Sequence, residues 1–167
     1  MSNLRTLEDF LQVGGGVRLI AVVVNPLHHT NSTSITDWAI RKPGSQLHLV
    51  QRYTTAYWCV LARAGTHLPT STTDADLRAA ISQRARSQPT AIIAPLVSRH
   101  FDFLDALISE GTLPLPPSTL KHALQSTILL LGSAPVGPTT VERLQQYAGR
   151  LPTVRFGSTE TCLQVSQ

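Results

Sequence analysis

The sequence predicts an α/β fold with a mainly parallel sheet flanked by helices. Short apolar runs rich in branched residues, which are typical of buried parallel strands, alternate along the chain with amphipathic helical segments. Glycine, proline and small polar residues separate these segments, as expected of the turns between them. The chain has 167 residues, of which 42% are hydrophobic, and this is enough for one domain with a substantial core.

The elements expected in the first part of the chain begin with a capped short helix at 6–11. The branched apolar run at 18–24 predicts a buried strand, which stops at Asn25-Pro26. The stretch 27–34 has the composition of a loop. Further elements expected before residue 70 are a short helix at 33–40, an alternating strand at 46–51 and a helix at 55–63.

The second part continues the alternation. Thr73 predicts the start of a helix that runs to about residue 85, and 90–94 predicts a short buried strand. Pro95 suits the first turn of the next helix, which Gly111 would close. The remaining expected elements are a short helix at 118–124, a strand at 127–131, a helix at 138–148 that stops at Gly149, and a strand at 153–156.

The composition argues against several classes of function. The net charge is +4, but the arginines are scattered and lack interleaved aromatic residues, so nucleic-acid binding is not predicted. Cys59 and Cys162 lie far apart, which favours reduced thiols in a cytoplasmic protein over a disulfide. Gly14–Gly16 and Arg18 interrupt the apolar run at 13–24, so neither a secretory signal nor a membrane span is expected. Charged residues make up only 14%, which predicts that some surface faces a partner.

Two motifs near the C-terminus carry the strongest functional signal. The strand at 127–131 runs into Gly132-Ser133-Ala134-Pro135, whose small residues allow backbone to approach a ligand closely. One helix later, a strand ends in Phe156-Gly157-Ser158-Thr159-Glu160. This aromatic ring, glycine, hydroxyls and carboxylate suit a planar base, a phosphate and a divalent cation. Either motif alone is compatible with a simple turn, whereas the two in this order are more specific.

The two motifs resemble the core of the adenylate-forming enzymes, which include acyl- and aryl-CoA synthetases, luciferases and the adenylation domains of peptide synthetases. Their pattern is Gly-Gly-Ala-Pro-Leu followed by Tyr-Gly-x-Thr-Glu. Upstream, 25–31 resembles the family's Pro-Leu-Phe-His segment, and 90–101 resembles the segment that leads its substrate-facing helix. The resemblance implies that residues 1–167 are a partial AMP-binding domain, from the middle of the family's large N-terminal domain. The phosphate loop and the C-terminal lysine domain are expected to be lacking.

The resemblance also implies roles for individual residues. Thr159 would hydrogen-bond the α-phosphate and Glu160 would hold Mg²⁺, so these two are the predicted catalytic residues. The predicted nucleotide-binding residues are Gly132, Ser133, Ala134, Pro135, Phe156, Gly157, Ser158 and Thr159. The predicted acyl pocket contains His29, Ala94, Val97, Gly132 and Gly157. Phe156 stands where the family usually has tyrosine, and its ring would stack on adenine without the hydroxyl.

The function implied is that of a fragment or subunit of an ATP-dependent carboxylate-activating ligase. It would form an acyl-adenylate from ATP with Mg²⁺ and then a thioester with CoA or a phosphopantetheine carrier. The implied partners are a small-molecule carboxylate and the complementary remainder of the enzyme, and the chain alone is not expected to be active. One alternative is a non-catalytic nucleotide-binding or protein-interaction module derived from the same fold. Another is an α/β domain whose similarity is accidental.

Three further features leave alternatives open. His28-His29 could line a pocket, form a plain loop or ligate a metal, although no third ligand stands at a suitable spacing. Asp102 and Asp105, at helical spacing, favour a solvated helix face over a catalytic dyad. The small and medium residues of the predicted pocket fit either an aryl or a medium-sized acyl group.

Overall fold

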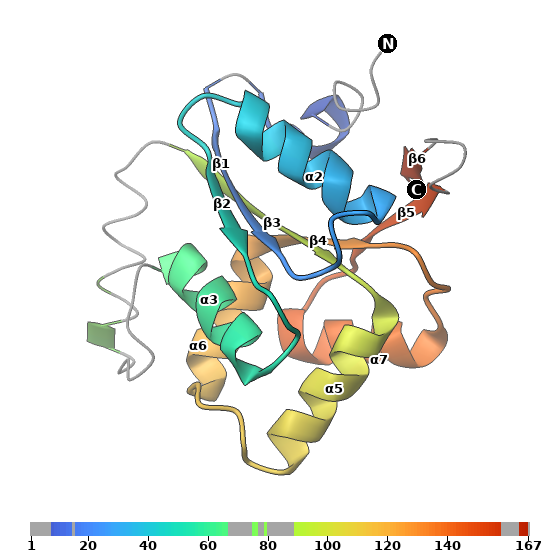
Figure 1. Ribbon diagram of the computed structural model, residues 1–167. Coiled ribbons are helices and arrows are strands. Elements are labelled where there is room, and N and C mark those ends of the chain that lie inside the picture. Colours follow the sequence, from blue (N-terminus) through green and yellow to red (C-terminus); the bar gives the residue numbers. More distant parts are fainter. Residues whose placement is uncertain are drawn as a thin grey trace.

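Within the residues that the structure describes, the sheet contains five parallel strands and one antiparallel strand, in the order β2-β1-β3-β4-β5-β6. The computed structural model describes residues 8–14, 16–66, 75–76, 79, 89–157 and 164–166. The strands are β1 (Arg18–Val23), β2 (Gln46–Leu49), β3 (Thr90–Leu96), β4 (Thr127–Leu131), β5 (Thr153–Gly157) and β6 (Gln164–Ser166). The predicted α/β fold with a mainly parallel sheet is confirmed (Figure 1).

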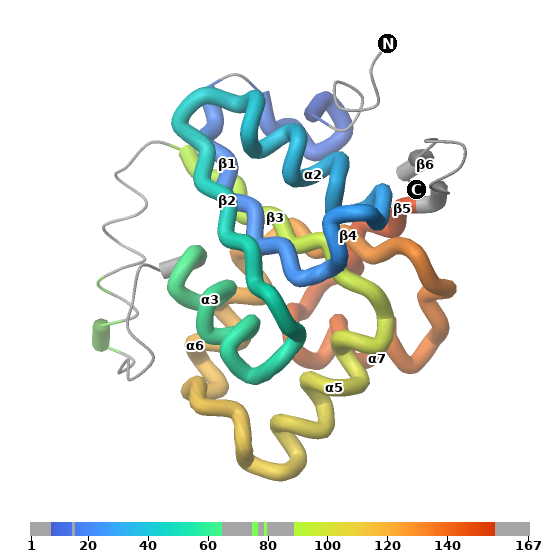
Figure 2. Tube along the Cα trace, viewed as in Figure 1, coloured from blue at the N-terminus to red at the C-terminus, as the bar shows by residue number. Residues whose placement is uncertain are grey.

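Helices cover both faces of the sheet, as Figures 1 and 2 show. One face carries α2 (Thr30–Arg41), whose Ile35 and Trp38 are buried against it. The opposite face carries α3 (Thr55–Thr66), α5 (Ser98–Ser109), α6 (Pro117–Ser126) and α7 (Pro138–Ala148). The largest core side chains on that second face are Tyr57, Trp58 and Phe101.

Strand β1 shows why its sequence is apolar without alternation. Leu19, Ala21 and Val23 belong to the core beneath α2, whereas Ile20 and Val22 belong to the core on the opposite face. All five are at most 2% exposed. A parallel strand that is covered on both faces needs apolar residues at every position, so the run at 18–24 is the expected signature.

Most elements agree with the prediction within one or two residues, and β4 and α7 have the predicted bounds. The segment 30–32 was predicted as loop and is the first part of α2, so that prediction was wrong, whereas the helix predicted from residue 33 is part of α2. The antiparallel strand β6 was not predicted. The helix predicted at 73–85 lies mostly outside the described residues, of which Ala75, Asp76 and Ala79 are helical.

Pro95 lies in β3 and not in a helix, which corrects the prediction made for it. The pairing of β1 with β3 ends at Ala21 and Ile93, so Pro95 lies beyond it. Its carbonyl accepts a hydrogen bond from Asn25 Nδ2 at 3.3 Å and therefore faces the β1 side. Because the N–H and C=O of one strand residue point to the same side, the missing N–H removes no bond to β4.

Within the part of the chain that the structure describes, no helix combines the length and the apolar character needed to cross a bilayer.

Candidate functional site

Hydrogen bonds join the segments that follow the strands at the carboxyl edge of the sheet. The Asn25 amide already ties the loop after β1 to β3. The Gly132 N–H donates to the Leu96 carbonyl at 3.2 Å, which ties the end of β4 to the end of β3. The Ser98 hydroxyl donates to the Pro135 carbonyl at 2.8 Å, which ties the start of α5 to the loop after β4. These segments therefore form one connected edge, where ligands of parallel sheets bind.

A buried arginine connects β5 to the first turns of α2. Arg155 is 6% exposed. Its Nη1 donates to Asn31 Oδ1 at 3.2 Å and its Nη2 donates to Ser34 Oγ at 3.1 Å. Burial lowers the pKa of the Arg155 guanidinium to about 10, so the group is still charged at neutral pH.

Gly132 is placed where no side chain fits comfortably. A Cβ at this position would lie 3.0 Å from the carbonyl oxygen of Arg155 and 3.7 Å from Asn31 Nδ2. The neighbouring Ser133 has a φ of 64°, which is the left-handed conformation that favours glycine. The sequence motif thus marks a close approach of β4, β5 and α2.

His29 and Val97 flank this edge as residues that precede helices. His29 is the N-cap of α2, and both it and His28 are exposed, with ring centroids 5.4 Å apart. The Val97 N–H donates to His100 Nδ1 at 3.2 Å at the start of α5. Among the described residues, no three His, Cys, Asp or Glu side chains are grouped to hold a metal ion. The histidine pair therefore has no metal-binding partner in that part of the chain.

Two residues of the predicted acyl pocket, Ala94 and Gly132, face opposite sides of the sheet. The side chain of Ala94 is fully buried in the core beneath α3 and α5, beside Leu96. Gly132 faces the other side of the sheet, toward Asn31. The structure does not bring Ala94 and Gly132 together, and the pocket role of Ala94 stays a prediction.

The second motif is described only in part. The backbones of Phe156 and Gly157 belong to β5 and pair with β6. Ser158, Thr159 and Glu160 lie outside the described residues, so their nucleotide, catalytic and Mg²⁺ roles stay predictions. In the first motif, Ser133, Ala134 and Pro135 are exposed, as a loop that touches a ligand requires.

Sequence reasoning missed the group formed by Arg155, Asn31 and Ser34. A signal was present, because Arg155 is a charged residue in the strand predicted at 153–156, directly before Phe156. A charged residue in a strand that the fold buries requires a polar partner or a ligand. The partners lie more than a hundred residues earlier in the chain, on a helix whose first turn was predicted as loop.

Asp102 and Asp105 do not form a catalytic dyad with each other. Arg143 on α7 donates a hydrogen bond to Asp102 and forms an ion pair with Asp105, with 3.2 Å between Arg143 Nη2 and Asp105 Oδ2. The hydroxyl of Tyr147 also donates to Asp105. The two carboxylates therefore join α5 to α7.

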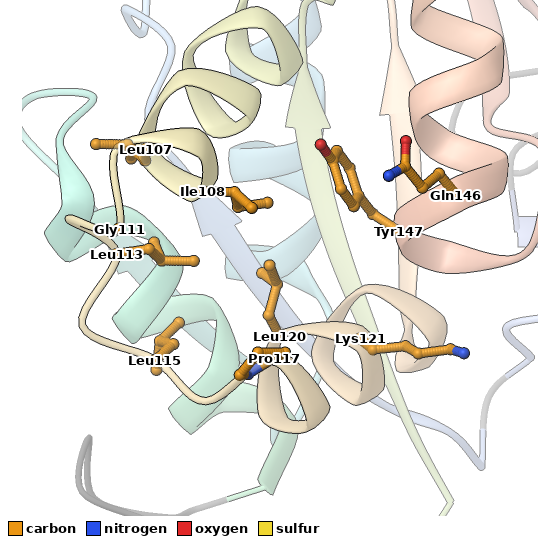
Figure 3. A pocket seen from close by; sticks show the side chains of 10 residues that line it. All are labelled: Leu107, Ile108, Gly111, Leu113, Leu115, Pro117, Leu120, Lys121, Gln146 and Tyr147. Carbon is orange, nitrogen blue, oxygen red and sulfur yellow. The ribbon is translucent and has the colours of Figure 1, made fainter.

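A cavity of about 370 Å³ lies among α5, α6 and α7, on the face of the sheet opposite α2 (Figure 3). Its lining is mostly aliphatic, and the polar side chains around it are those of Lys121, Gln146 and Tyr147. Helix α5 starts at the carboxyl end of β3, and its last turn, with Leu107 and Ile108, lines this cavity. The cavity therefore lies toward the amino ends of the strands and is separate from the edge described above.

Comparison with known proteins finds similarity to solved structures, and this similarity is one of fold. No family model and no curated protein matches the sequence. A malonyl-CoA ligase, solved as a ternary product complex with methylmalonyl-CoA and AMP, matches with a TM-score of 0.61 and 21% identity, over 95% of this chain and 27% of that chain. ATP-bound MatB from Rhodopseudomonas palustris matches with a TM-score of 0.61 and 19% identity, over 99% of this chain and 26% of MatB.

The adenylation domain of a keto acid-selecting NRPS module, bound to a keto acyl adenylate, has the same fold over 98% of this chain and 26% of its own. The TM-score is 0.56 and the identity is 14%. All three are adenylate-forming enzymes, so the chain has the fold of one part of such enzymes, as the resemblance implied. The chain spans about a quarter of the length of these enzymes.

Proposed function

We propose that this chain forms part of an ATP-dependent ligase that activates a carboxylate. In the first step, a carboxylate oxygen attacks the α-phosphorus of ATP, the bond to the β-phosphate oxygen breaks, and pyrophosphate leaves. In the second step, the sulfur of CoA or of a phosphopantetheine carrier attacks the acyl carbonyl and AMP leaves. The observation that carries the proposal is that Gly132, Asn31 and Arg155, each in or beside a motif segment, meet at one edge of the sheet.

The proposal assigns roles to the first motif from its geometry. The exposed Ser133 and Ala134 would lie beside the adenine, because their loop follows β4 at the edge where ligands of parallel sheets bind. Gly132 would place bare backbone beside the acyl group, since a side chain there has no room. His29, at the start of α2, would orient the carboxylate.

The second motif would supply the phosphate contacts. Thr159 would donate a hydrogen bond to the α-phosphate, and Glu160 would offer Mg²⁺ the hard oxygen ligand that it prefers. When bound, Mg²⁺ would neutralise phosphate charge. Phe156 would stack on the adenine and Gly157 would leave room for the acid.

The remainder of the enzyme is the proposed partner of this chain. This chain matches only about a quarter of each of the enzymes that share its fold, which supports such a partner. We further propose a cytoplasmic location, which the free, buried Cys59 supports.

Pyrophosphate release tests the proposal. The chain is mixed with ATP, Mg²⁺ and a panel of carboxylates, alone and together with a polypeptide that supplies the rest of the ligase. We expect release only in the mixture, and a reduction of roughly a hundredfold for Thr159→Ala and for Glu160→Gln. Glu110→Gln, on the exposed end of α5, is the matched control for loss of a carboxylate and should retain full activity.

Absence of pyrophosphate release under every condition would remove the enzyme proposal. A thermal-shift measurement with AMP then decides between the remaining interpretations. Stabilisation by AMP without turnover supports the non-catalytic nucleotide-binding module. If neither pyrophosphate release nor stabilisation by AMP is observed, the chain is an α/β domain that shares only the fold of the adenylate-forming enzymes.

A further inference from the structure

Arg155 is a buried cation without an acidic partner in the described part of the chain. None of the ion pairs among residues 8–14, 16–66, 75–76, 79, 89–157 and 164–166 includes it. Its two hydrogen-bond acceptors, Asn31 Oδ1 and Ser34 Oγ, are both neutral. A buried charge is costly unless an opposite charge compensates it, so this arrangement favours an anion beside Arg155.

The donors around Arg155 are also not fully used. Asn31 is 6% exposed, and its Nδ2 is buried without a hydrogen-bond partner. A buried polar group of this kind is normally satisfied, and here it is an N–H donor that suits an anion.

The first turn of α2 adds to the positive potential. It contains no acidic residue, and the N-cap His29 makes no side-chain capping bond. The N-terminus of a helix carries partial positive charge and favours anions. Three independent features, the guanidinium, the unpartnered amide and the helix terminus, therefore favour negative charge at the same place.

The position of this group relative to Gly132 indicates the kind of anion. Asn31 hydrogen-bonds the guanidinium through Oδ1, and its Nδ2 lies on the Gly132 side, 3.7 Å from where a Cβ would be. One amide side chain thus spans from Arg155 to the glycine beside which the acyl group is proposed to lie. A carboxylate that reacts near Gly132 and a second one held by Arg155 would be separated by only a short chain.

We propose that Arg155 and Asn31 recognise a second, non-reacting carboxylate, so that the acid activated by this protein is a short dicarboxylate. This inference rests on the proposed function. The planar guanidinium matches a carboxylate with two parallel hydrogen bonds, and the Asn31 amide adds a neutral donor. A monocarboxylic acid of the same length would leave Arg155 uncompensated and would bind more weakly.

Titration of the ¹⁵N-labelled full chain tests this proposal by NMR. The probes are malonate and succinate, and the length-matched controls are propionate and butyrate. We expect the Arg155 Nε–H resonance to shift with the dicarboxylates, which should bind about tenfold or more tightly than the monocarboxylates. Equal binding of both classes, or an Arg155 resonance that does not move, would overturn the proposal.

Asn31→Asp is the decisive variant, since it keeps the size of the side chain and supplies the missing negative charge. We expect it to raise the melting temperature without ligand and to lower dicarboxylate affinity about tenfold or more. Gln145→Glu, on the exposed face of α7, adds the same charge elsewhere. It should change neither the melting temperature nor the affinity for dicarboxylates. If Asn31→Asp binds dicarboxylates as well as the parent does, Arg155 is only a structural residue.

The pyrophosphate-release assay with the complementary polypeptide distinguishes this inference from the proposed function. Binding of dicarboxylates by the chain without pyrophosphate release in the mixture would keep the acid site and remove the ligase proposal. Pyrophosphate release in the mixture without a preference for dicarboxylates would keep the ligase proposal and remove the acid site.

Discussion

At the scale of single residues, Ser133 shows a conflict between sequence and backbone. Its φ of 64° places a residue with a Cβ in the left-handed region, at a cost of about 1–2 kcal/mol. Glycine removes that cost, but it loses more conformational entropy on folding, which lowers the stability by about 0.5–1 kcal/mol. We therefore expect Ser133→Gly to stabilise the chain by about 0.5–1 kcal/mol, measured by urea denaturation.

Ala134→Gly is the matched control, because Ala134 is also exposed in this loop and does not have a positive φ. It should destabilise by about 0.5–1 kcal/mol, since only the entropic term applies. If Ser133→Gly and Ala134→Gly change the free energy of unfolding in the same direction, the backbone strain assigned to Ser133 is contradicted.

At the scale of elements, the end of α7 depends on one glycine. Gly149 has a φ of 66° and its N–H donates to the Gln145 carbonyl at 3.0 Å, which closes the helix. An alanine at this position finds ordinary packing distances but must adopt the left-handed conformation. We expect Gly149→Ala to cost about 1 kcal/mol in the free energy of unfolding.

The control for α7 is Gly14→Ala, because Gly14 has no neighbour within 4 Å of an added Cβ and does not have a positive φ. It should be neutral or slightly stabilising. If Gly14→Ala lowers the free energy of unfolding as much as Gly149→Ala does, the left-handed conformation at the end of α7 does not explain the effect at Gly149.

The elements also show how far the sequence predicts this fold and its site. The bounds of β4 and α7 could be predicted because local signals, a branched apolar run and a glycine stop, agree with the tertiary structure. Pro95 could not, because its place in β3 depends on where β1 stops pairing, which is a non-local fact. The site shows the same contrast. Gly132 belongs to a local motif that could be recognised in the sequence, whereas the contact of Arg155 with Asn31 joins residues far apart in the chain and could not be predicted.

At the scale of the whole molecule, one half-buried histidine, His100, couples folding to pH. The ring of His100 stacks on Tyr53 with centroids 4.1 Å apart, and the Tyr53 hydroxyl donates to the His100 carbonyl at 2.6 Å. Its Nδ1 accepts the Val97 N–H, so this nitrogen carries no proton. Burial lowers the pKa of His100 from 6.5 to about 4.

The lowered pKa of His100 fixes the direction of the pH effect. Between pH 6.5 and about 4, the unfolded chain binds a proton at His100 that the folded chain does not. Stability is therefore complete above pH 6.5 and falls as the pH drops toward 4, by about 2–3 kcal/mol from this group alone. Equilibrium unfolding in urea across this range should show the loss in the parent, and His100→Gln should reduce it by that amount. His28→Gln, at an exposed position, should leave the pH profile unchanged, and parallel profiles for the parent and His100→Gln would contradict the assignment.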